Sequence, residues 1–378
     1  MRIMISCGEA SGDLYAGALA AALRAREPTV EIMGFGGPRL EAAGASLAGD
    51  FRGLTVTGLT EALRVLPRSY AMYRRLVGAA RARRPDLFVA IDFPDFNFRL
   101  MAALRRLGIP IVYYVSPQLW AWRPGRLKTM QRLVDRVLVI FPFEVPIYER
   151  AGVPVQFVGH PLADLARASR PRAAFLRDQE LDPDAPTVAL LPGSRPNELR
   201  QIAPAIAGAL PRIIAAVPAV QFIVARAPNL PDDLFTPFQD RVVVREATDE
   251  VLAASDVVIT ASGTATVQAA LHERPMVVVY RVSPVSYRIG KPFLKVDTYA
   301  MPNLVAGRRI VPELIQDECT PERIAAEAVA LLTDRDRHAR TREALRVVRE
   351  RLGAPGASGR AADAILEVAA RAAGATSA

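Results

Sequence analysis

The chain has 378 residues, enough for two domains with full hydrophobic cores, and its apolar and charged fractions (51% and 23%) are those of a folded globular protein. Two cysteines, Cys7 and Cys319, exclude a disulfide-stapled scaffold and suit a reducing compartment. The net charge of +9 favours an anionic partner, yet the absence of a basic tail, zinc-knuckle spacing or aromatic-basic motif argues against nucleic acid.

We expect neither a targeting segment nor a membrane-spanning segment. The N-terminus enters a strand-like run at once, without the long apolar region of a signal peptide. The longest uncharged candidates are short; one of them, at 109–122, also contains two prolines, which argues against a span of the bilayer.

The first half of the chain alternates short apolar runs with helical patterns. We expect strands at 3–7, 30–35, 86–91, 109–115, 137–141 and 155–158, with helices at 14–26 and 96–107 and a short helix after Gly37. This alternation predicts a doubly wound, mostly parallel sheet. The segment 160–184 has weak periodicity and is the best candidate for a linker.

The second half repeats the pattern from Thr187. We expect strands at 187–191, 219–225, 241–244, 256–260 and 276–280, and helices from Pro321 to the end. The expected organisation is a first Rossmann-like domain at 1–165, a second at 166–345, and C-terminal helices at 346–378 that cross back to the first domain or to a partner subunit of a homodimer. Such halves place ligands at the carboxyl ends of their strands, facing one cleft.

Two strand-to-helix turns in the second half are suited to phosphate. Gly193-Ser194-Arg195 and Ser262-Gly263-Thr264 each follow an apolar strand and open a helix, where backbone N–H groups and the helix dipole favour anions. An ordinary turn with a surface arginine, or a capped helix start, explains each one alone. Together the two turns favour a ligand that carries a diphosphate. P-loop ATPases and NAD enzymes are disfavoured, because no Walker or G-x-G-x-x-G motif is present.

Two carboxylates follow the strand expected at 86–91. We assign Asp92 as general base, because a strand end holds it rigidly and Phe93 and Phe96 can raise its pKa by desolvation. Asp95 is assigned to helix capping or substrate contact.

The loop after the first expected strand carries Glu9, Ser11 and Asp13, whose polar groups suit sugar hydroxyls. The alternative is a helix start with Ser11 as N-cap and Asp13 at the dipole. The three histidines, His160, His272 and His338, lack metal-ligand spacing, so we expect structural roles and no metal.

The segment 61–86 is basic and amphipathic, with no acidic residue between its ends. Its composition is that of a helix lying on a membrane surface, although a solvated helix packed on its own domain would have similar residues. The candidate membrane contacts are Leu66, Arg68, Tyr70, Tyr73 and Arg74.

Several motifs resemble, in the same order, those of the lipid-A-disaccharide synthase family of GT-B glycosyltransferases. They are GEASGD at 8–13, GGPR at 36–39, PDLFVAIDFPDFN at 85–97, YVSPQLWAWR at 114–123, FPFE at 141–144, LLPGSR at 190–195, ASGTAT at 261–266 and MPNLVAGR at 301–308. Each motif is weak alone, but together they span nearly the whole chain.

The resemblance implies an inverting, metal-independent transfer that needs no cofactor. UDP-2,3-diacylglucosamine would be the donor, 2,3-diacylglucosamine 1-phosphate (lipid X) the acceptor, and the products the β-1,6-linked lipid A disaccharide 1-phosphate and UDP. Such enzymes are cytoplasmic and bind the inner face of the inner membrane.

The same resemblance implies residue roles. Asp92 matches the proposed base and Arg195 the arginine on the donor phosphate, while Asn97 and Asn303 fall on the acceptor side. Relatives often have a glutamate at the position of Gln268, where it binds the ribose hydroxyls. Glutamine can still accept a hydrogen bond from the ribose, but it lacks the negative charge.

Two alternatives remain at this point. A UDP-N-acetylglucosamine 2-epimerase of similar architecture would act on a soluble sugar nucleotide without a lipid acceptor. A non-catalytic protein that binds a sugar nucleotide or lipid would not need Asp92.

Overall fold

The computed structural model describes residues 1–51, 59–119, 124–228, 230–282, 287 and 298–376. The chain forms two compact units, one of Met1–Pro161 with Leu352–Ala378 and one of Leu162–Arg351. It therefore crosses between the units twice, at 161/162 and 351/352, a few residues from the expected 165/166 and 345/346. The expected linker at 160–184 contains two short helices, α8 (Leu162–Leu165) and α9 (Arg172–Asp178).

The first unit is built on a seven-stranded parallel sheet in the order β3-β2-β1-β4-β5-β6-β7. Its strands are β1 (Arg2–Cys7), β2 (Glu31–Gly36), β3 (Ser46–Asp50), β4 (Leu87–Ile91), β5 (Ile111–Tyr114), β6 (Arg136–Val139) and β7 (Val155–Phe157). Its helices are α1 (Ala10–Arg26), α2 (Pro38–Ala42), α3 (Leu59–Arg83), α4 (Pro94–Arg105), η1 (Pro124–Arg126), α6 (Leu127–Leu133), η2 (Pro142–Glu144), α7 (Val145–Arg150) and α17 (Ala357–Thr376). Strands such as β4 are buried along their whole length, which explains their continuous apolar sequence.

The second unit repeats this architecture with six parallel strands in the order β10-β9-β8-β11-β12-β13. Its strands are β8 (Thr187–Leu191), β9 (Gln221–Arg226), β10 (Val242–Arg245), β11 (Val257–Ala261), β12 (Met276–Tyr280) and β13 (Glu313–Ile315). Besides α8 and α9 its helices are α10 (Pro196–Ala216), η3 (Asp232–Phe238), α11 (Thr248–Ala254), α12 (Thr264–Leu271), α14 (Met301–Ala306), η5 (Gln316–Glu318), α15 (Pro321–Thr333) and α16 (Arg335–Arg351). The α10 and α15 helices pack against the same core of this unit.

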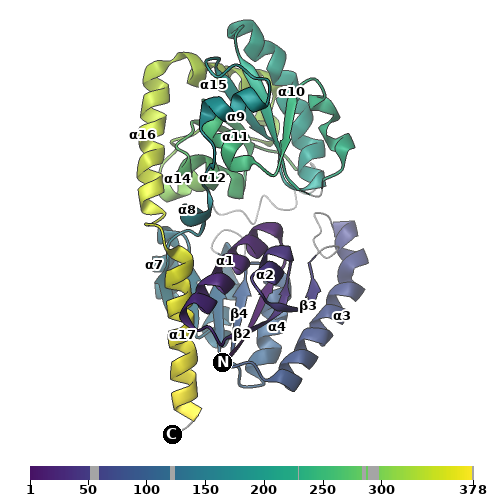
Figure 1. Cartoon of the computed structure of the whole chain (residues 1–378), viewed down its shortest axis with the longest axis vertical. Helices are drawn as coiled ribbons and strands as arrows, with labels where there is room; N and C mark the ends of the chain where they lie inside the picture. The colour runs from purple at the N-terminus through teal and green to yellow at the C-terminus, as the bar shows by residue number, and fades with distance from the viewer. Residues whose placement is uncertain (52–58, 120–123, 229, 283–286, 288–297, 377–378) are drawn as a thin grey trace. The chain divides into compact units, whose positions relative to one another are not determined.

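The last helix returns to the first unit. Figure 1 shows α17 lying beside α1, and the Arg26 guanidinium pairs with the Asp363 carboxylate across that contact. Arg136 Nη1 lies 2.6 Å from Glu367 Oε2 and ties the same helix to β6. The α16 helix, in contrast, belongs to the second unit.

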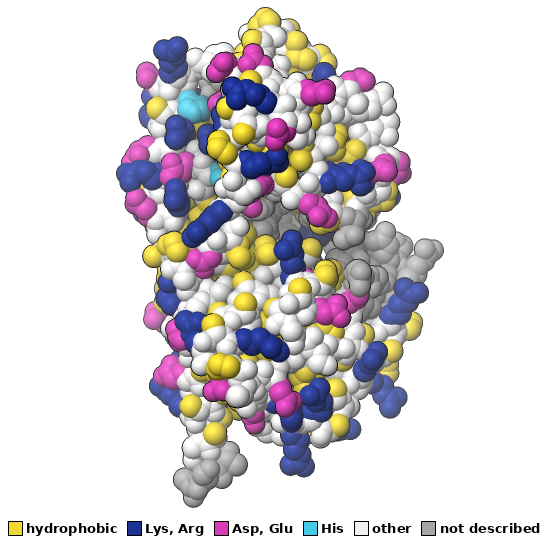
Figure 2. All heavy atoms as spheres, viewed as in Figure 1, with side chains coloured by type: hydrophobic (Ala, Val, Ile, Leu, Met, Phe, Trp, Pro, Cys, Tyr) yellow, Lys and Arg dark blue, Asp and Glu magenta, His cyan; other side chains and the backbone are white. Residues whose placement is uncertain are grey.

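The α3 helix has two different faces within its described side chains. Leu76, Val77 and Ala80 are buried in the core of the first unit. Leu66 and Tyr70 are 48% and 62% exposed. Figure 2 shows Lys and Arg side chains gathered along the lower right edge, where α3 lies in Figure 1. Within the part of the chain described, no helix has both the length and the hydropathy to cross a membrane.

Candidate active site

The loop that follows β1 and the loop that follows β4 lie side by side. The two strands are parallel neighbours, and Cys7 pairs in register with Ile91, the last residue of β4. Gly8 and Asp92 therefore begin adjacent loops at the carboxyl edge of the sheet. Burial raises the pKa of the Cys7 thiol well above its usual value, and the nearby Asp13 and Asp92 charges add to the effect.

Asp92 lies in an unusual backbone turn. Asp92 and Phe93 have φ values of 45° and 50°, so two consecutive residues other than glycine are left-handed. That conformation costs about 1–2 kcal/mol per residue and persists only where surrounding contacts impose it. The carbonyl oxygen of Asp92 accepts bonds from Asn97 Nδ2 at 2.8 Å and from the Tyr113 hydroxyl at 2.7 Å.

An aromatic cluster packs against the same turn. The Phe93 ring stacks on Phe35 and on Phe96, with centroids 6.3 and 5.3 Å apart. It also lies so close to Gly8 that a Cβ at that position would collide with the ring, which explains the glycine after β1. Asp92 itself is half-buried beside this apolar cluster.

Two polar residues expected to contact the acceptor are instead buried inside the first unit. The Asp13 carboxylate accepts from the backbone N–H groups of Gly37, Arg39 and Leu40, at 2.7, 2.9 and 3.1 Å, and so holds the start of α2. Asn97 is fully buried and accepts from Ser6 Oγ at 2.7 Å. Neither side chain has surface to offer a sugar, because both are committed to internal bonds.

The other expected acceptor residues remain at the surface of this edge. Glu9 is the N-cap residue of α1, in place of the expected Ser11, and both are half-buried. Asp95 does not cap α4, since Phe93 is its N-cap; its carboxylate lies 2.5 Å from Arg126 Nη2. The motif at 114–123 follows β5, but its residues 120–123 lie outside the described part.

In the second unit, the two expected phosphate turns are also neighbours. Leu191, at the end of β8, pairs in register with Thr260 of β11, so the turns that follow these strands lie together. Gly193 has φ 128°, a conformation that favours glycine, and α10 begins at Pro196 with Arg195 as N-cap. Ser194 is exposed and Arg195 is half-buried.

The second turn is open on its outer side. Gly263 and Thr264 are exposed at the start of α12, and Ser262 is half-buried with its backbone N–H bonded to Val279 at 3.0 Å. Gln268 lies one turn further along α12. Its Nε2 is 3.5 Å from Asp249 Oδ1, which also contacts His272 Nε2 at 2.9 Å.

Asn303 is 1% exposed and forms part of the second unit's interior. Its Nδ2 donates to Glu313 Oε1 at 2.6 Å and to the Val311 carbonyl at 3.0 Å, while its Oδ1 accepts from the Ile310 and Val311 N–H groups. The Asn303 side chain therefore has almost no exposed surface for the expected contact with the acceptor. Its amide instead links α14 to β13.

Sequence reasoning missed two residues of these sites. Tyr113 lies inside the apolar run of β5, where a tyrosine gives no signal beyond strand propensity. Glu198 occupies the third position of α10, where a carboxylate is expected to bond the backbone ahead of the helix. It does so, accepting from the Ser194 N–H at 3.3 Å and from Arg195 Nη1 at 3.2 Å.

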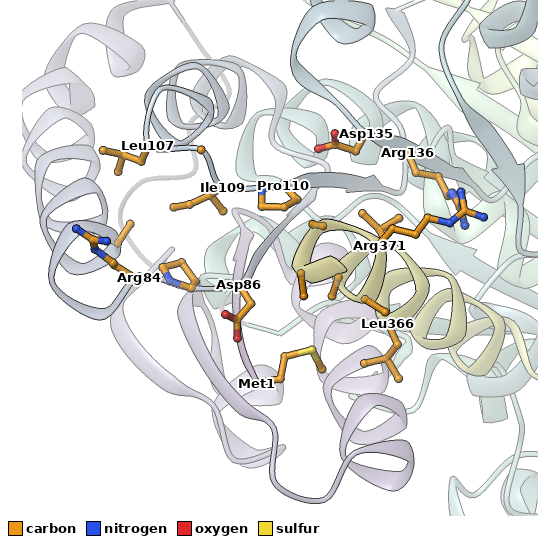
Figure 3. A pocket seen from close by; sticks show the side chains of 18 of the residues that line it. Met1, Arg84, Asp86, Leu107, Ile109, Pro110, Asp135, Arg136, Leu366 and Arg371 are labelled. Atoms are coloured by element: carbon orange, nitrogen blue, oxygen red, sulfur yellow. The ribbon is translucent and has the colours of Figure 1, made fainter. Parts of the chain in front are cut away.

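The first unit also has a groove of about 1300 Å³, which does not include the loops after β1 and β4. Figure 3 shows Met1, Asp86, Pro110 and Arg136 lining it together with Arg371 of α17. The first four precede or begin β1, β4, β5 and β6, so the groove follows the amino edge of the sheet. Among the described residues, no group of three His, Cys, Asp or Glu side chains is arranged to hold a metal ion.

Comparison with known sequences decides the family. Residues 3–368 match the profile of the lipid-A-disaccharide synthetase family. The lipid-A-disaccharide synthases of Myxococcus xanthus (strain DK1622) and Geobacter sulfurreducens (strain ATCC 51573 / DSM 12127 / PCA) are each 44% identical, over 97% of this chain and 97% of theirs. The chain belongs to this family.

Solved structures place the chain among GT-B folds. UDP-GlcNAc 2-epimerase from Neisseria meningitidis matches with TM-score 0.68 at 13% identity, covering 97% of this chain and all of the other. The calicheamicin glycosyltransferase CalG4 matches with a TM-score of 0.63 at 18% sequence identity, covering 98% of both chains. MurG of Acinetobacter baumannii matches with a TM-score of 0.57 at 16% sequence identity, covering 97% of this chain and 99% of the other. These likenesses show the fold alone.

Membership in the lipid-A-disaccharide synthetase family makes the chain a hexosyltransferase of lipid A disaccharide synthesis. The relatives at 44% identity are lipid-A-disaccharide synthases, so neither an epimerase nor a non-catalytic binding protein is favoured. The match to the epimerase, at 13% identity, is a likeness of fold alone.

Proposed function

We propose that the enzyme transfers 2,3-diacylglucosamine from UDP to the 6-hydroxyl of 2,3-diacylglucosamine 1-phosphate (lipid X). In this reaction the acceptor oxygen forms a bond to the anomeric carbon as the bond from that carbon to the diphosphate breaks. UDP leaves with the electron pair, and the anomeric configuration inverts to give a β-1,6 link.

Asp92 is the base in this proposal. Its carboxylate takes the hydroxyl proton as the acceptor oxygen attacks, a step that contributes about 10²–10⁴-fold to the rate of such reactions. The observation that carries the assignment is the left-handed turn at Asp92 and Phe93, because backbone strain that neighbouring bonds impose is concentrated at functional sites.

The donor diphosphate binds the paired turns of the second unit. Adjacent strands present the Ser194 and Thr264 backbones and the Arg195 guanidinium at one edge of the sheet. These groups stabilise the negative charge that grows on UDP as the glycosidic bond breaks. UDP complexes among the fold relatives, such as MnaA of S. aureus, are consistent with a UDP-sugar substrate. We assign the ribose to the region of Gln268.

The lipid substrates approach through α3. Exposed Leu66 and Tyr70 stand on the same helix as Arg68 and Arg74, a combination that suits an anionic lipid surface. Tyr73 is half-buried and stacks on Tyr70 with centroids 6.1 Å apart. The enzyme would thus act at the inner face of the inner membrane as a peripheral protein.

The test is a direct assay of the purified full chain with UDP-2,3-diacylglucosamine and lipid X. We expect a product with the mass of the disaccharide 1-phosphate, together with one equivalent of UDP. Release of UDP and free acylated sugar without lipid X, or no disaccharide with both substrates, would contradict the proposal.

A further inference from the structure

Asp92 is held in place by a buried hydrogen-bond network. The network comprises Ser6 of β1, Asn97 of α4 and Tyr113 of β5, all of them fully buried. Ser6 Oγ donates to Asn97 Oδ1 at 2.7 Å, and this bond fixes the orientation of the Asn97 amide. The Asn97 Nδ2 then faces three carbonyl oxygens, of which that of Asp92 is nearest at 2.8 Å, with those of Ser6 and Ile91 at 3.4 Å.

Tyr113 reaches the same atom from the neighbouring strand. Its hydroxyl donates to the Asp92 carbonyl oxygen at 2.7 Å, so this oxygen accepts two side-chain bonds from two different elements. Burial, with the nearby Asp92 charge, raises the pKa of Tyr113 well above its usual value. The hydroxyl consequently keeps its proton and donates throughout the working pH range.

The geometry points to Tyr113 and Asn97 as positioning residues for Asp92, a role that rests on the proposed function of Asp92 as base. An extended residue at position 92 would turn its carbonyl away from both donors, so Asn97 would lose its shortest bond and Tyr113 its bond to Asp92, and losing buried bonds is costly. The two bonds therefore offset the strain of the left-handed turn. A base held in one geometry reacts faster than one that samples several.

The sharpest test removes one oxygen atom. Tyr113→Phe keeps the ring and removes the hydroxyl that donates to the Asp92 carbonyl. Tyr148→Phe is the matched control, because Tyr148 is also fully buried in the first unit and bonds Ser116 instead. We expect Tyr113→Phe to lower kcat about tenfold with the donor KM nearly unchanged, and Tyr148→Phe to stay within about twofold of wild type.

A double-mutant cycle separates positioning from general destabilisation. In the Asp92→Ala background, assayed at raised enzyme concentration, Tyr113→Phe should cause no further loss, because it acts only through Asp92. Equal kcat values for the Tyr113→Phe and Tyr148→Phe variants, or a full tenfold loss that persists without Asp92, would overturn the inference.

The same set of variants distinguishes the two ideas. If Asp92→Ala turns over normally, the base assignment fails, and the positioning role falls with it. If Asp92→Ala is inactive but Tyr113→Phe resembles its control, the base assignment stands and the positioning role alone is lost. Melting temperatures of all variants identify any that fail to fold.

Discussion

The Arg195 guanidinium donates to the Glu198 carboxylate, with Nη1 3.2 Å from Oε1. The other carboxylate oxygen of Glu198 accepts from the backbone N–H of Ser194 at 3.3 Å. An internal anion thus occupies the donors that we assign to the diphosphate. Both charges also act on Tyr280, at the end of β12. Burial raises the pKa of Tyr280, the negative charge of Glu198 raises it further, and the positive charge of Arg195 lowers it.

The first prediction concerns Arg195. Its replacement by alanine should weaken UDP binding roughly tenfold or more, since bonds to charged groups contribute about 1.5–3 kcal/mol. Isothermal titration with UDP measures the change. Arg200→Ala is the control, because Arg200 is exposed on the same helix and bonds Asn197. Equal affinity of the Arg195→Ala variant and wild type would remove Arg195 from the donor site.

A second prediction separates two roles for Asn303. Because its amide makes four internal bonds, Asn303→Ala should lower the free energy of unfolding by about 1–3 kcal/mol. Denaturant unfolding measures this, with the half-buried Asn197→Ala as the control. A variant of full stability that has lost turnover would instead indicate direct contact with substrate, as the family resemblance implied.

The sequence predicted the alternating architecture because buried parallel strands leave continuous apolar runs. Thr187–Leu191 and Met276–Tyr280 are apolar throughout their cores, and their expected bounds agree with β8 and β12. Two edge strands lacked this signal. Ser46–Asp50 contains Gly49 and ends in an aspartate, and Glu313–Ile315 is three residues long with a buried glutamate bonded to Asn303.

The loops that carry the candidate site were predictable, whereas the orientation of their side chains was not. Strand ends placed Asp92 and Arg195 at the carboxyl edges by topology alone. Asp13, by contrast, bonds backbone groups 24 to 27 residues away, so its burial depends on how α1 packs against α2. Local sequence cannot reveal a partner at that separation.

His160 gives a prediction on pH. Burial lowers its pKa to about 3, so the folded state keeps it neutral while the unfolded state gains a proton below about pH 6.5. The stability of the wild type should therefore fall relative to His160→Gln as the pH drops. The expected relative loss is about 2 kcal/mol between pH 7 and pH 5, measured by denaturant unfolding. If the free energy of unfolding depends on pH in the same way in the wild type and in His160→Gln, then the pKa of His160 does not change on folding.

The membrane surface of α3 can be tested with vesicles that contain anionic phospholipid. Leu66→Ser combined with Tyr70→Ser should lower partitioning by roughly tenfold or more, since inserting one apolar side chain contributes about 1.5–3 kcal/mol. The control pair, Leu107→Ser with Val347→Ser, removes apolar side chains that are 39% and 36% exposed elsewhere. UDP binding should survive in both proteins. If both pairs partition equally, α3 is not the contact surface.

The most direct test of the account is the turnover of Asp92→Asn, which keeps the shape of the side chain and removes its ability to accept a proton. We predict that kcat falls on the order of 100-fold or more, while UDP affinity and melting temperature match the wild type. Turnover at the wild-type rate by this variant would contradict the assignment of Asp92 as the base.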